Sequence, residues 1–164
     1  MRLVVADTSP IRYLVRIGHI DLLPGLFERI FLPSVVADEL LHPSAPPTVR
    51  DWMRQPPGGL EVVPVAEIDD PALDALDRGE RSAIALGLSL KADLILVDDR
   101  KGAVAALNKG FEVTGTLGVL DLAAERGMVD LVDAFDRLKR TNFRYRPGLL
   151  DVLLKKHGNR GGQA

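Results

Sequence analysis

Short apolar runs that alternate with helix-like segments constrain the fold of this chain more than any other feature. The segments between these runs carry apolar residues at helical spacing, with Gly and Pro at their borders. Continuous apolar runs are typical of strands buried on both faces, and their alternation with helices indicates an α/β domain with a mainly parallel sheet. The expected strands are LVVA (3–6), IFLP (30–33), LEVVPV (60–65), LILV (94–97) and FEVT (111–114).

The length of 164 residues predicts a single domain, which we place at about residues 1–160. Five prolines at 43–59 indicate an inserted loop around one short helix at 48–54. Residues 134–160 hold eight Lys or Arg against two Asp, so this basic helical tail carries +6 and leaves −8 for the remainder. Such a tail suits phosphates or an acidic partner, unless its charges simply face solvent.

The composition excludes several kinds of site. There is no cysteine, which removes disulfides and thiolate chemistry, and there are only three histidines. Carboxylates are therefore the main candidate ligands, and they suit hard cations such as Mg²⁺ or Mn²⁺. No apolar stretch approaches the roughly 20 residues of a membrane span, and the first residues do not resemble a signal peptide, so we expect a cytoplasmic protein without membrane contact.

Acidic residues follow two of the expected strands. LVVAD ends in Asp7, and LILVDD ends in Asp98 and Asp99. Ligands of open parallel sheets bind beyond the carboxyl ends of the strands, near a switch in strand order, so these carboxylates can meet there. Each also has a structural alternative, because Asp before a helix is a common N-cap. A divalent cation would relieve the repulsion between acids brought together at this edge.

Two more acids lie on expected helices with apolar surroundings. Glu39 lies within SVVADELL, and Glu80 precedes the long apolar run of RGERSAIALGL. A charge beside an apolar face requires a partner. For Glu80 the alternative to a ligand is a helix-dipole role with pairing to Arg81 or Lys91.

The ordered set of motifs VVADTSP, SVVADEL, DRGERSAIAL, LILVDDRKG and GFEVTGTLGVL resembles the PIN-domain family. More narrowly, it resembles the DUF3368 group, which includes homologues of VapC-type toxins. The resemblance covers about residues 3–127, and the tail RTNFRYRPGLLDVLL is also similar. It implies a three-layer α/β/α sandwich and a Mg²⁺- or Mn²⁺-dependent ribonuclease.

The resemblance also implies a set of site residues. The acidic site would comprise Asp7, Glu39, Glu80, Asp98 and Asp99, with the metal held by Asp7, Glu80, Asp98 and Asp99. If alternation continues past the strand, Asp98 and Asp99 point in different directions, so we favour Asp98 as the ligand and keep Asp99 as a second ligand or the helix cap. The residues expected to contact substrate are Thr8, Ser9, Arg81, Arg100 and Thr116.

The partners implied by the resemblance are RNA, a small antitoxin protein and a second copy of the chain. The apolar faces around Leu14 and Leu23–Leu26 would serve such contacts, unless they pack in the core. A catalytically silent PIN-like binding module is the competing interpretation. A phosphatase of the haloacid dehalogenase type is disfavoured, because its second Asp would fall at position 9, which is Ser. The sequence has no aromatic platform of the RNP type, so it gives no sign of sequence-specific base stacking.

Overall fold

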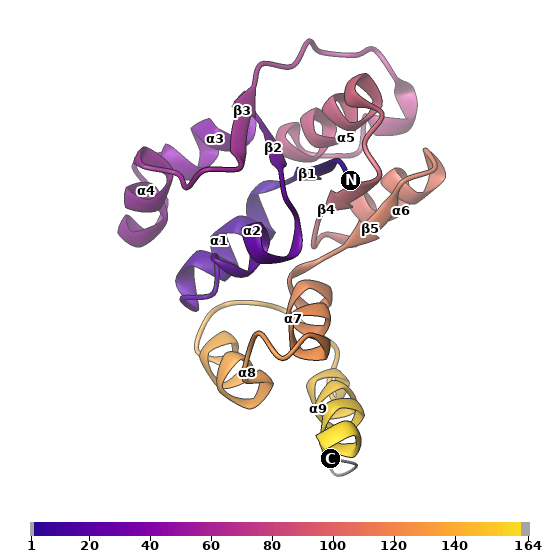
Figure 1. Cartoon of the computed structure of the whole chain (residues 1–164). Helices are drawn as coiled ribbons and strands as arrows, with labels where there is room; N and C mark the ends of the chain where they lie inside the picture. The colour runs from indigo at the N-terminus through magenta and orange to yellow at the C-terminus, as the bar shows by residue number, and fades with distance from the viewer. Residues whose placement is uncertain (1, 162–164) are drawn as a thin grey trace.

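The computed structural model describes residues 2–161, with side chains described as far as residue 158. Met1 and the side chain of Arg160, which belong to the predicted domain and basic tail, lie outside the described part. The strands are β1 (Val4–Ala6), β2 (Ile30–Pro33), β3 (Leu60–Val63), β4 (Leu94–Leu96) and β5 (Glu112–Thr114). Figure 1 shows them with the helices α1 (Thr8–Arg16), α2 (Leu22–Leu26), α3 (Ser34–Leu41), α4 (Pro47–Arg54), α5 (Arg78–Leu90), α6 (Arg100–Asn108), α7 (Thr116–Glu125), α8 (Leu131–Lys139) and α9 (Leu149–Gly161).

The strands form one parallel sheet in the order β3-β2-β1-β4-β5, as the sequence predicts. The chain moves outward in one direction from β1 to β3 and then crosses to the other side at β4. The switch in strand order therefore falls between β1 and β4, which pair with Ala6 opposite Leu96. A ligand crevice is expected beyond the carboxyl ends of these two strands.

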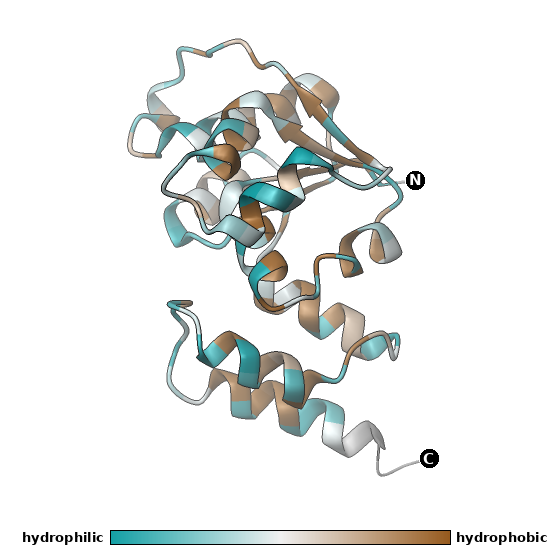
Figure 2. Ribbon diagram, turned by 90° about the vertical axis from the view of Figure 1, so that its left-hand side faces the viewer, coloured by the Kyte–Doolittle hydropathy of each residue, from teal (hydrophilic) through white to brown (hydrophobic). Residues whose placement is uncertain are grey.

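Alternate strand residues supply two separate cores, which makes the domain three layers thick. Val4 and Ala6 face a core shared with α1, α3, α4, α7 and α8, whereas Val5 faces a core shared with α5 and α6. In Figure 2 the strands between these layers are mostly brown, in keeping with burial on both faces. This arrangement is the predicted α/β/α sandwich.

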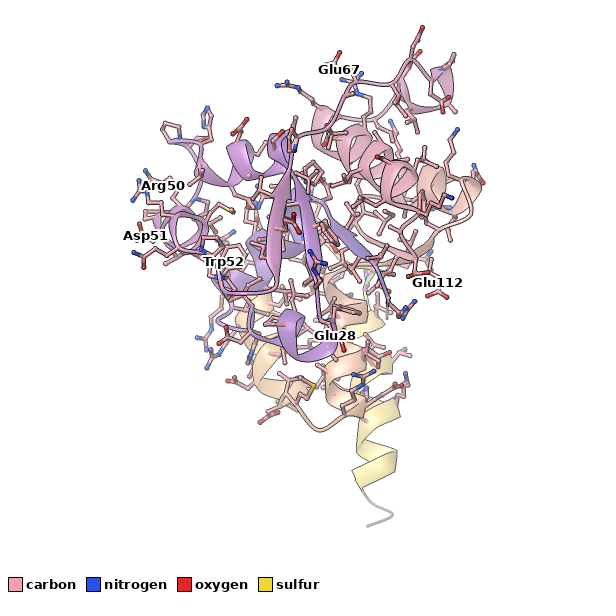
Figure 3. The ribbon with its side chains drawn as sticks, turned by 45° about the horizontal axis from the view of Figure 1, so that its top comes forward. Glu28, Arg50, Asp51, Trp52, Glu67 and Glu112 are labelled. Carbon is pink, nitrogen blue, oxygen red and sulfur yellow. The ribbon has the colours of Figure 1, made fainter. Side chains whose placement is uncertain are left out.

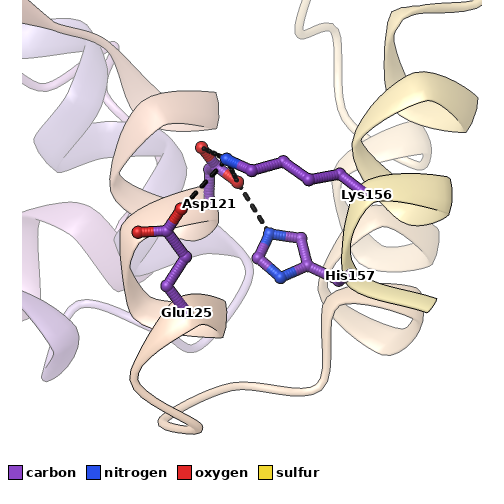
Figure 4. A network of polar contacts seen from close by, with 4 residues as sticks. All are labelled: Asp121, Glu125, Lys156 and His157. Carbon is purple, nitrogen blue, oxygen red and sulfur yellow. Dashed lines mark hydrogen bonds and ion pairs between the residues drawn. The ribbon is translucent and has the colours of Figure 1, made fainter. Parts of the chain in front are cut away.

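Helices α8 and α9 extend the layer formed by α1 and α7, and they lie below the sheet in Figure 1. A polar network joins α9 to α7 (Figure 4). Lys156 Nζ lies 3.0 Å from both Asp121 Oδ2 and Glu125 Oε1, and His157 Nε2 lies 2.7 Å from Asp121 Oδ1. At the start of α9, Leu150 is buried in the core. The basic tail is therefore partly tied to acids of the domain.

Local structure departs from common sequence signals in three places. Asp70-Pro71 is a typical helix start, but only a 3₁₀ turn, Pro71–Leu73, follows it, in which Asp70 Oδ1 accepts from Ala72 N. Thr8 and Ser34 are residue types typical of N-caps, but they are the first helical residues after Asp7 and Pro33.

The 43–59 insert contains α4, which begins one residue earlier than predicted. Figure 3 shows α4, marked by Arg50, Asp51 and Trp52, on the opposite side of the view from Glu112 on β5. Trp52 packs partly against the core, so this segment is anchored to the domain.

Leu14 and Leu23 are buried within the chain's own core, with 0% and 2% of their surface exposed. These two leucines are therefore core positions, whereas in the rest of the suggested face Leu26 is half-buried against the core and Pro24 and Gly25 are exposed. No helix among residues 2–161 has both the length and the apolar character needed to cross a membrane.

Candidate active site

Asp7 is the residue that follows β1, and it lies at the switch in strand order. Its backbone N–H donates to Leu96 O over 2.9 Å, so the pairing of β1 with β4 fixes its position. Only 5% of its surface is exposed. It occupies the N-cap position of α1, but its side chain makes no capping hydrogen bond. Burial without such a bond is costly for a carboxylate and marks Asp7 as a functional candidate.

Glu39 on α3 meets Asp7 across Gly79, the second residue of α5. A Cβ built on Gly79 would lie 2.9 Å from Asp7 Oδ1 and 3.1 Å and 3.2 Å from the two carboxylate oxygens of Glu39. The missing side chain therefore leaves the space in which these two acids approach each other. Glu39 is exposed, and its Oε2 accepts a hydrogen bond from Thr8 Oγ1.

Glu80 is buried at the start of α5, with 7% of its surface exposed. It forms a capping box with Asp77, in which Glu80 N donates to Asp77 Oδ1 over 2.8 Å and Asp77 N donates to Glu80 Oε2 over 3.4 Å. Its side chain also lies against Gly102, where a Cβ would be 3.3 Å from Glu80 Cδ. The sequence analysis missed Asp77, although the spacing of Asp77 and Glu80 before an apolar run is a capping-box signature.

Electrostatics at this edge are dominated by like charges. Burial raises the pKa of Asp7 to about 7, and the charges of Asp77, Glu80 and Glu39 add to the effect. Burial likewise raises the pKa of Glu80 to about 7, with Asp77 and Asp99 contributing. These two carboxyl groups are held where ionisation is penalised, and a bound cation would remove that penalty.

The two adjacent aspartates after β4 have different roles. Asp99 is the N-cap of α6, and its Oδ1 accepts from Lys101 N and Gly102 N. Asp98 turns toward the start of α7, where Oδ1 accepts from Thr116 N over 2.6 Å and Oδ2 accepts from Thr116 Oγ1 over 2.8 Å. Burial raises the pKa of Asp98, while hydrogen bonds from Thr116 and the charge of Arg12 limit the rise.

Arg12 on α1 is a second residue that the sequence analysis did not single out. Besides acting on Asp98, it lines a groove of about 380 Å³ together with Thr8, Glu39 and His42. Its Nε is buried and has no hydrogen-bond partner. The signal in the sequence was its spacing, because Arg12 lies one helical turn after Thr8 and shares its face.

The remaining residues expected to contact substrate differ in their burial and in how closely they approach the acids. Thr116 is fully buried against Asp98, and Ser9 is half-buried in the first turn of α1. Arg100 is exposed in a hollow that it shares with Asp99. Arg81 lines a different hollow, with Glu67 and Arg78, and it reaches the acids only through its backbone N–H, which donates to Asp77 O over 3.0 Å.

The oxygen donors at this edge are chemically suited to Mg²⁺ or Mn²⁺. They comprise buried carboxylates whose pKa values are raised to about 7, together with the hydroxyl groups of Thr8 and Thr116. Within residues 2–161, however, no three acidic or histidine side chains are already arranged as a metal centre. The donor set fits a divalent ion, but its side chains are engaged with one another and with backbone N–H groups.

A parallel α/β/α sheet with carboxylates gathered beyond its switch point defines the PIN-like class of domains. A family model described as DUF3368, PIN domain, matches residues 3–159. The chain therefore belongs to the PIN-domain family, whose members are generally nucleases that use divalent metal ions.

A solved structure with a similar fold is a PilT N-terminus domain protein from the hyperthermophilic archaeon Sulfolobus solfataricus P2. The two proteins are 12% identical, with a TM-score of 0.48, over 87% of this chain and 99% of the archaeal one. No curated protein matches this chain.

Proposed function

We propose that this protein is a metal-dependent endoribonuclease that hydrolyses RNA phosphodiester bonds at the edge formed by Asp7, Glu39, Glu80 and Asp98. The observation that carries the proposal is the burial of Asp7 and Glu80, at 5% and 7% exposure, with no basic side chain of the described residues paired to either. Two such carboxylates side by side destabilise a domain, so their presence argues for a cationic ligand.

In this proposal the metal is held by Asp7, Glu80 and Asp98, with Asp99 as the neighbouring acid that also caps α6. When bound, Mg²⁺ or Mn²⁺ lowers the pKa of a coordinated water and balances the charge of the phosphodiester transition state.

The chain's own residues orient this site. Thr116 holds both oxygens of Asp98, and Thr8 holds one oxygen of Glu39, so each of these two carboxylates keeps one orientation. Gly79 leaves the space between Asp7 and Glu39 free of a side chain. Arg12, with its uncommitted Nε, supplies positive charge for a substrate phosphate beside the acids.

The test is cleavage of a single-stranded RNA in Mg²⁺ or Mn²⁺ by the full chain and by Asp7→Asn or Asp98→Asn. We expect each substitution to abolish cleavage while circular dichroism shows that the fold persists. Gly79→Ala retains every acid but fills the space between Asp7 and Glu39, so it should also lower the rate sharply. Gly158→Ala, in α9 with no atom within 4 Å of the added Cβ, is the matched control and should cleave normally. Cleavage that survives both Asn variants would refute the proposal.

A catalytically silent PIN-like binding module is the second candidate. The observation that favours it is that the described acids do not converge as a ready-made metal centre and are engaged in capping and hydroxyl contacts. Titration with Mn²⁺ separates the two candidates. Absence of binding at millimolar Mn²⁺ would select the silent module.

The similarity to VapC-type toxins extends the proposal to a toxin that is neutralised by a small antitoxin and that pairs with a second copy of the chain. Growth arrest on expression, dependent on Asp7 and reversed by a neighbouring small protein, is the expected behaviour. If the protein cleaves RNA but its expression leaves growth unaffected, the toxin role is refuted and the ribonuclease activity is not.

A further inference from the structure

The loop between α8 and α9 has a composition unlike the rest of the chain. Residues 140–146 read RTNFRYR, with three arginines, two aromatic residues and no acid. The rings of Phe143 and Tyr145 are stacked, with centroids 6.4 Å apart and an interplanar angle of 20°. Tyr145 is 38% exposed, so this stack has an outer ring that meets solvent.

This loop is packed along α1, and its direction along that helix is defined by its contacts. Arg137 Nη1, before the loop, donates to Ile17 O over 3.1 Å. Asn142 Oδ1 then accepts from Arg16 Nη1 and Tyr13 Oη, over 3.1 Å and 3.0 Å. Successive loop residues thus meet successively earlier parts of α1, so the loop runs toward the helix N-terminus where Asp7 lies. In Figure 1 the loop accordingly rises toward the sheet before the chain turns into α9.

Side chains in contact connect the loop to the acidic edge. Phe143 meets Tyr13 edge-on, with ring centroids 5.0 Å apart, and the guanidinium of Arg12 lies 5.3 Å from the centroid of the Tyr13 ring. Arg12 in turn borders Thr8 in the groove beside the acids, and its charge acts on Asp98. The exposed stack is therefore joined to the acidic site by a chain of side-chain contacts that passes through the buried ring of Tyr13.

The arginines of this surface lack acidic partners. Among the described residues, ion pairs hold Arg2, Arg29, Arg54 and Arg137. No ion pair among these residues holds the arginines of the surface, which are Arg12, Arg16, Arg140, Arg144 and Arg146, although the charge of Arg12 acts on Asp98. Arginines elsewhere, such as Arg78 and Arg126, are also without an ion pair, so the surface is distinguished by its arginines lying beside an exposed aromatic stack.

Positive charge without acidic partners selects for a polyanion, and an exposed aromatic stack selects for one with accessible ring faces. Single-stranded nucleic acid meets both requirements. A duplex hides its base faces, and an acidic peptide would use the arginines but leave the rings unused.

We propose that the surface from Arg12 to Tyr145 binds single-stranded RNA, with phosphates on the arginines and a base stacked on Tyr145. The strand would pass along α1 and enter the acidic site beside Arg12. The identity of the polymer as RNA rests on the proposed ribonuclease function, whereas the single-stranded character rests on the exposed stack and the arginines without acidic partners.

The experiment measures binding rather than cleavage. Fluorescence anisotropy of a labelled single-stranded oligoribonucleotide is recorded in EDTA with the full chain. Tyr145→Ala should weaken binding at least about fivefold, because one stacked base is lost, and Tyr145→Phe should retain it. Arg144→Ala combined with Arg146→Ala should lower the slope of log K against log salt by about 1.4, as two phosphate contacts disappear.

The matched control is Arg2→Ala combined with Arg29→Ala, which removes the same charge at the amino edge of the sheet. Both control residues are exposed and paired with glutamates, and their loss should leave the salt slope unchanged. Unaltered binding in Tyr145→Ala, an equal loss in the control, or tighter binding of duplex RNA or of polyglutamate would overturn the proposal.

The result is also separable from the test of the ribonuclease. If Asp7→Asn abolishes cleavage but Tyr145→Ala leaves RNA binding intact, the proposed RNA-binding surface is refuted and the ribonuclease is not. Binding that depends on Tyr145, in a protein whose cleavage is unaffected by Asp7→Asn and Asp98→Asn, refutes the ribonuclease alone.

Discussion

The carboxyl groups of Asp7 and Glu80 are almost fully buried from solvent in the folded protein. Their burial is imposed by their positions, one at the end of the central strand and one in the first turn of α5. Asp99 and Asp77 satisfy backbone N–H groups as N-caps, whereas the Asp7 side chain makes no capping bond. These acids thus take different roles: Asp77 and Asp99 cap helices, whereas Asp7 keeps a raised pKa because its burial outweighs the backbone hydrogen bond from Thr8.

The raised pKa of Asp7 predicts how stability depends on pH in the metal-free protein. Burial raises this pKa from 3.8 to about 7, so the folded state binds a proton that the unfolded state releases. The contribution of protonated Asp7 to the stability of the fold is fully present below about pH 4, and it is lost as the pH rises to about 7. At pH 8 the free energy of unfolding of Asp7→Asn should therefore be about 2 to 4 kcal/mol higher than that of the natural protein. At pH 4 the two free energies should be about equal.

Urea denaturation in EDTA at the two pH values measures this difference. Comparing the variant with the natural protein cancels the opposite contribution of His19, whose pKa burial lowers. A difference in the free energy of unfolding that is the same at pH 4 and pH 8 would contradict the raised pKa of Asp7.

Among the elements, α9 illustrates how the basic tail becomes part of the domain. Leu150 anchors its start in the core, and Lys156 and His157 hold its later turns to Asp121 on α7. Burial acts to raise the pKa of Asp121, but hydrogen bonds from His157 and Lys156 outweigh it and hold this pKa below its usual value. Stabilisation from this acid is therefore present above about pH 4 and is lost as pH falls below it.

Asp121→Asn should loosen α9 without disturbing the sheet. Two partners lose a charged acceptor, so we expect a loss of about 1 to 2 kcal/mol at pH 7, discounted for partial exposure. Hydrogen exchange should accelerate in α9 and remain unchanged in β1 and β4. Asp136→Asn, an exposed acid on α8, is the control. Uniformly faster exchange throughout the domain would show that the network supports more than this helix.

At the scale of the whole molecule, opposite charges are separated onto neighbouring surfaces. The acids lie beyond the carboxyl edge of the sheet, while the 140–146 loop, which carries three arginines, packs on α1 through Asn142. In the proposed ribonuclease, the arginines would attract the RNA and the acids would hold it, provided that a cation offsets their charge.

Metal binding should stabilise the whole domain in a manner that depends on pH. With free Mn²⁺ at about one hundred times its Kd, the expected rise in Tm at pH 8 is about 5 to 10 °C. The rise should be smaller at pH 5, because protons compete for carboxyl groups whose pKa is about 7. Differential scanning fluorimetry measures it, with Asp136→Asn as the control. An equal rise in Asp7→Asn would place the ion elsewhere.

The sequence by itself determined the parallel α/β fold, because apolar runs buried on both faces have one stable arrangement between helices. It also predicted that Asp7 and the aspartates after β4 lie at one edge, since all strands of a parallel sheet end there. That β1 and β4 are neighbours at this edge comes from the structure. The short 3₁₀ turn at Pro71–Leu73 escaped prediction, because capping by Asp70 alone does not extend a helix.

Only the tertiary structure decided which acids meet and which cap helices. The approach of Asp7 to Glu39 depends on the missing side chain of Gly79, and Asp98 turns away from Asp99 because Thr116 donates to it from α7. These contacts join residues from 18 to 72 positions apart, and short-range patterns in the sequence carry no record of such distances. The same reason explains why the packing of Phe143 against Tyr13 on α1 became visible only in the folded chain.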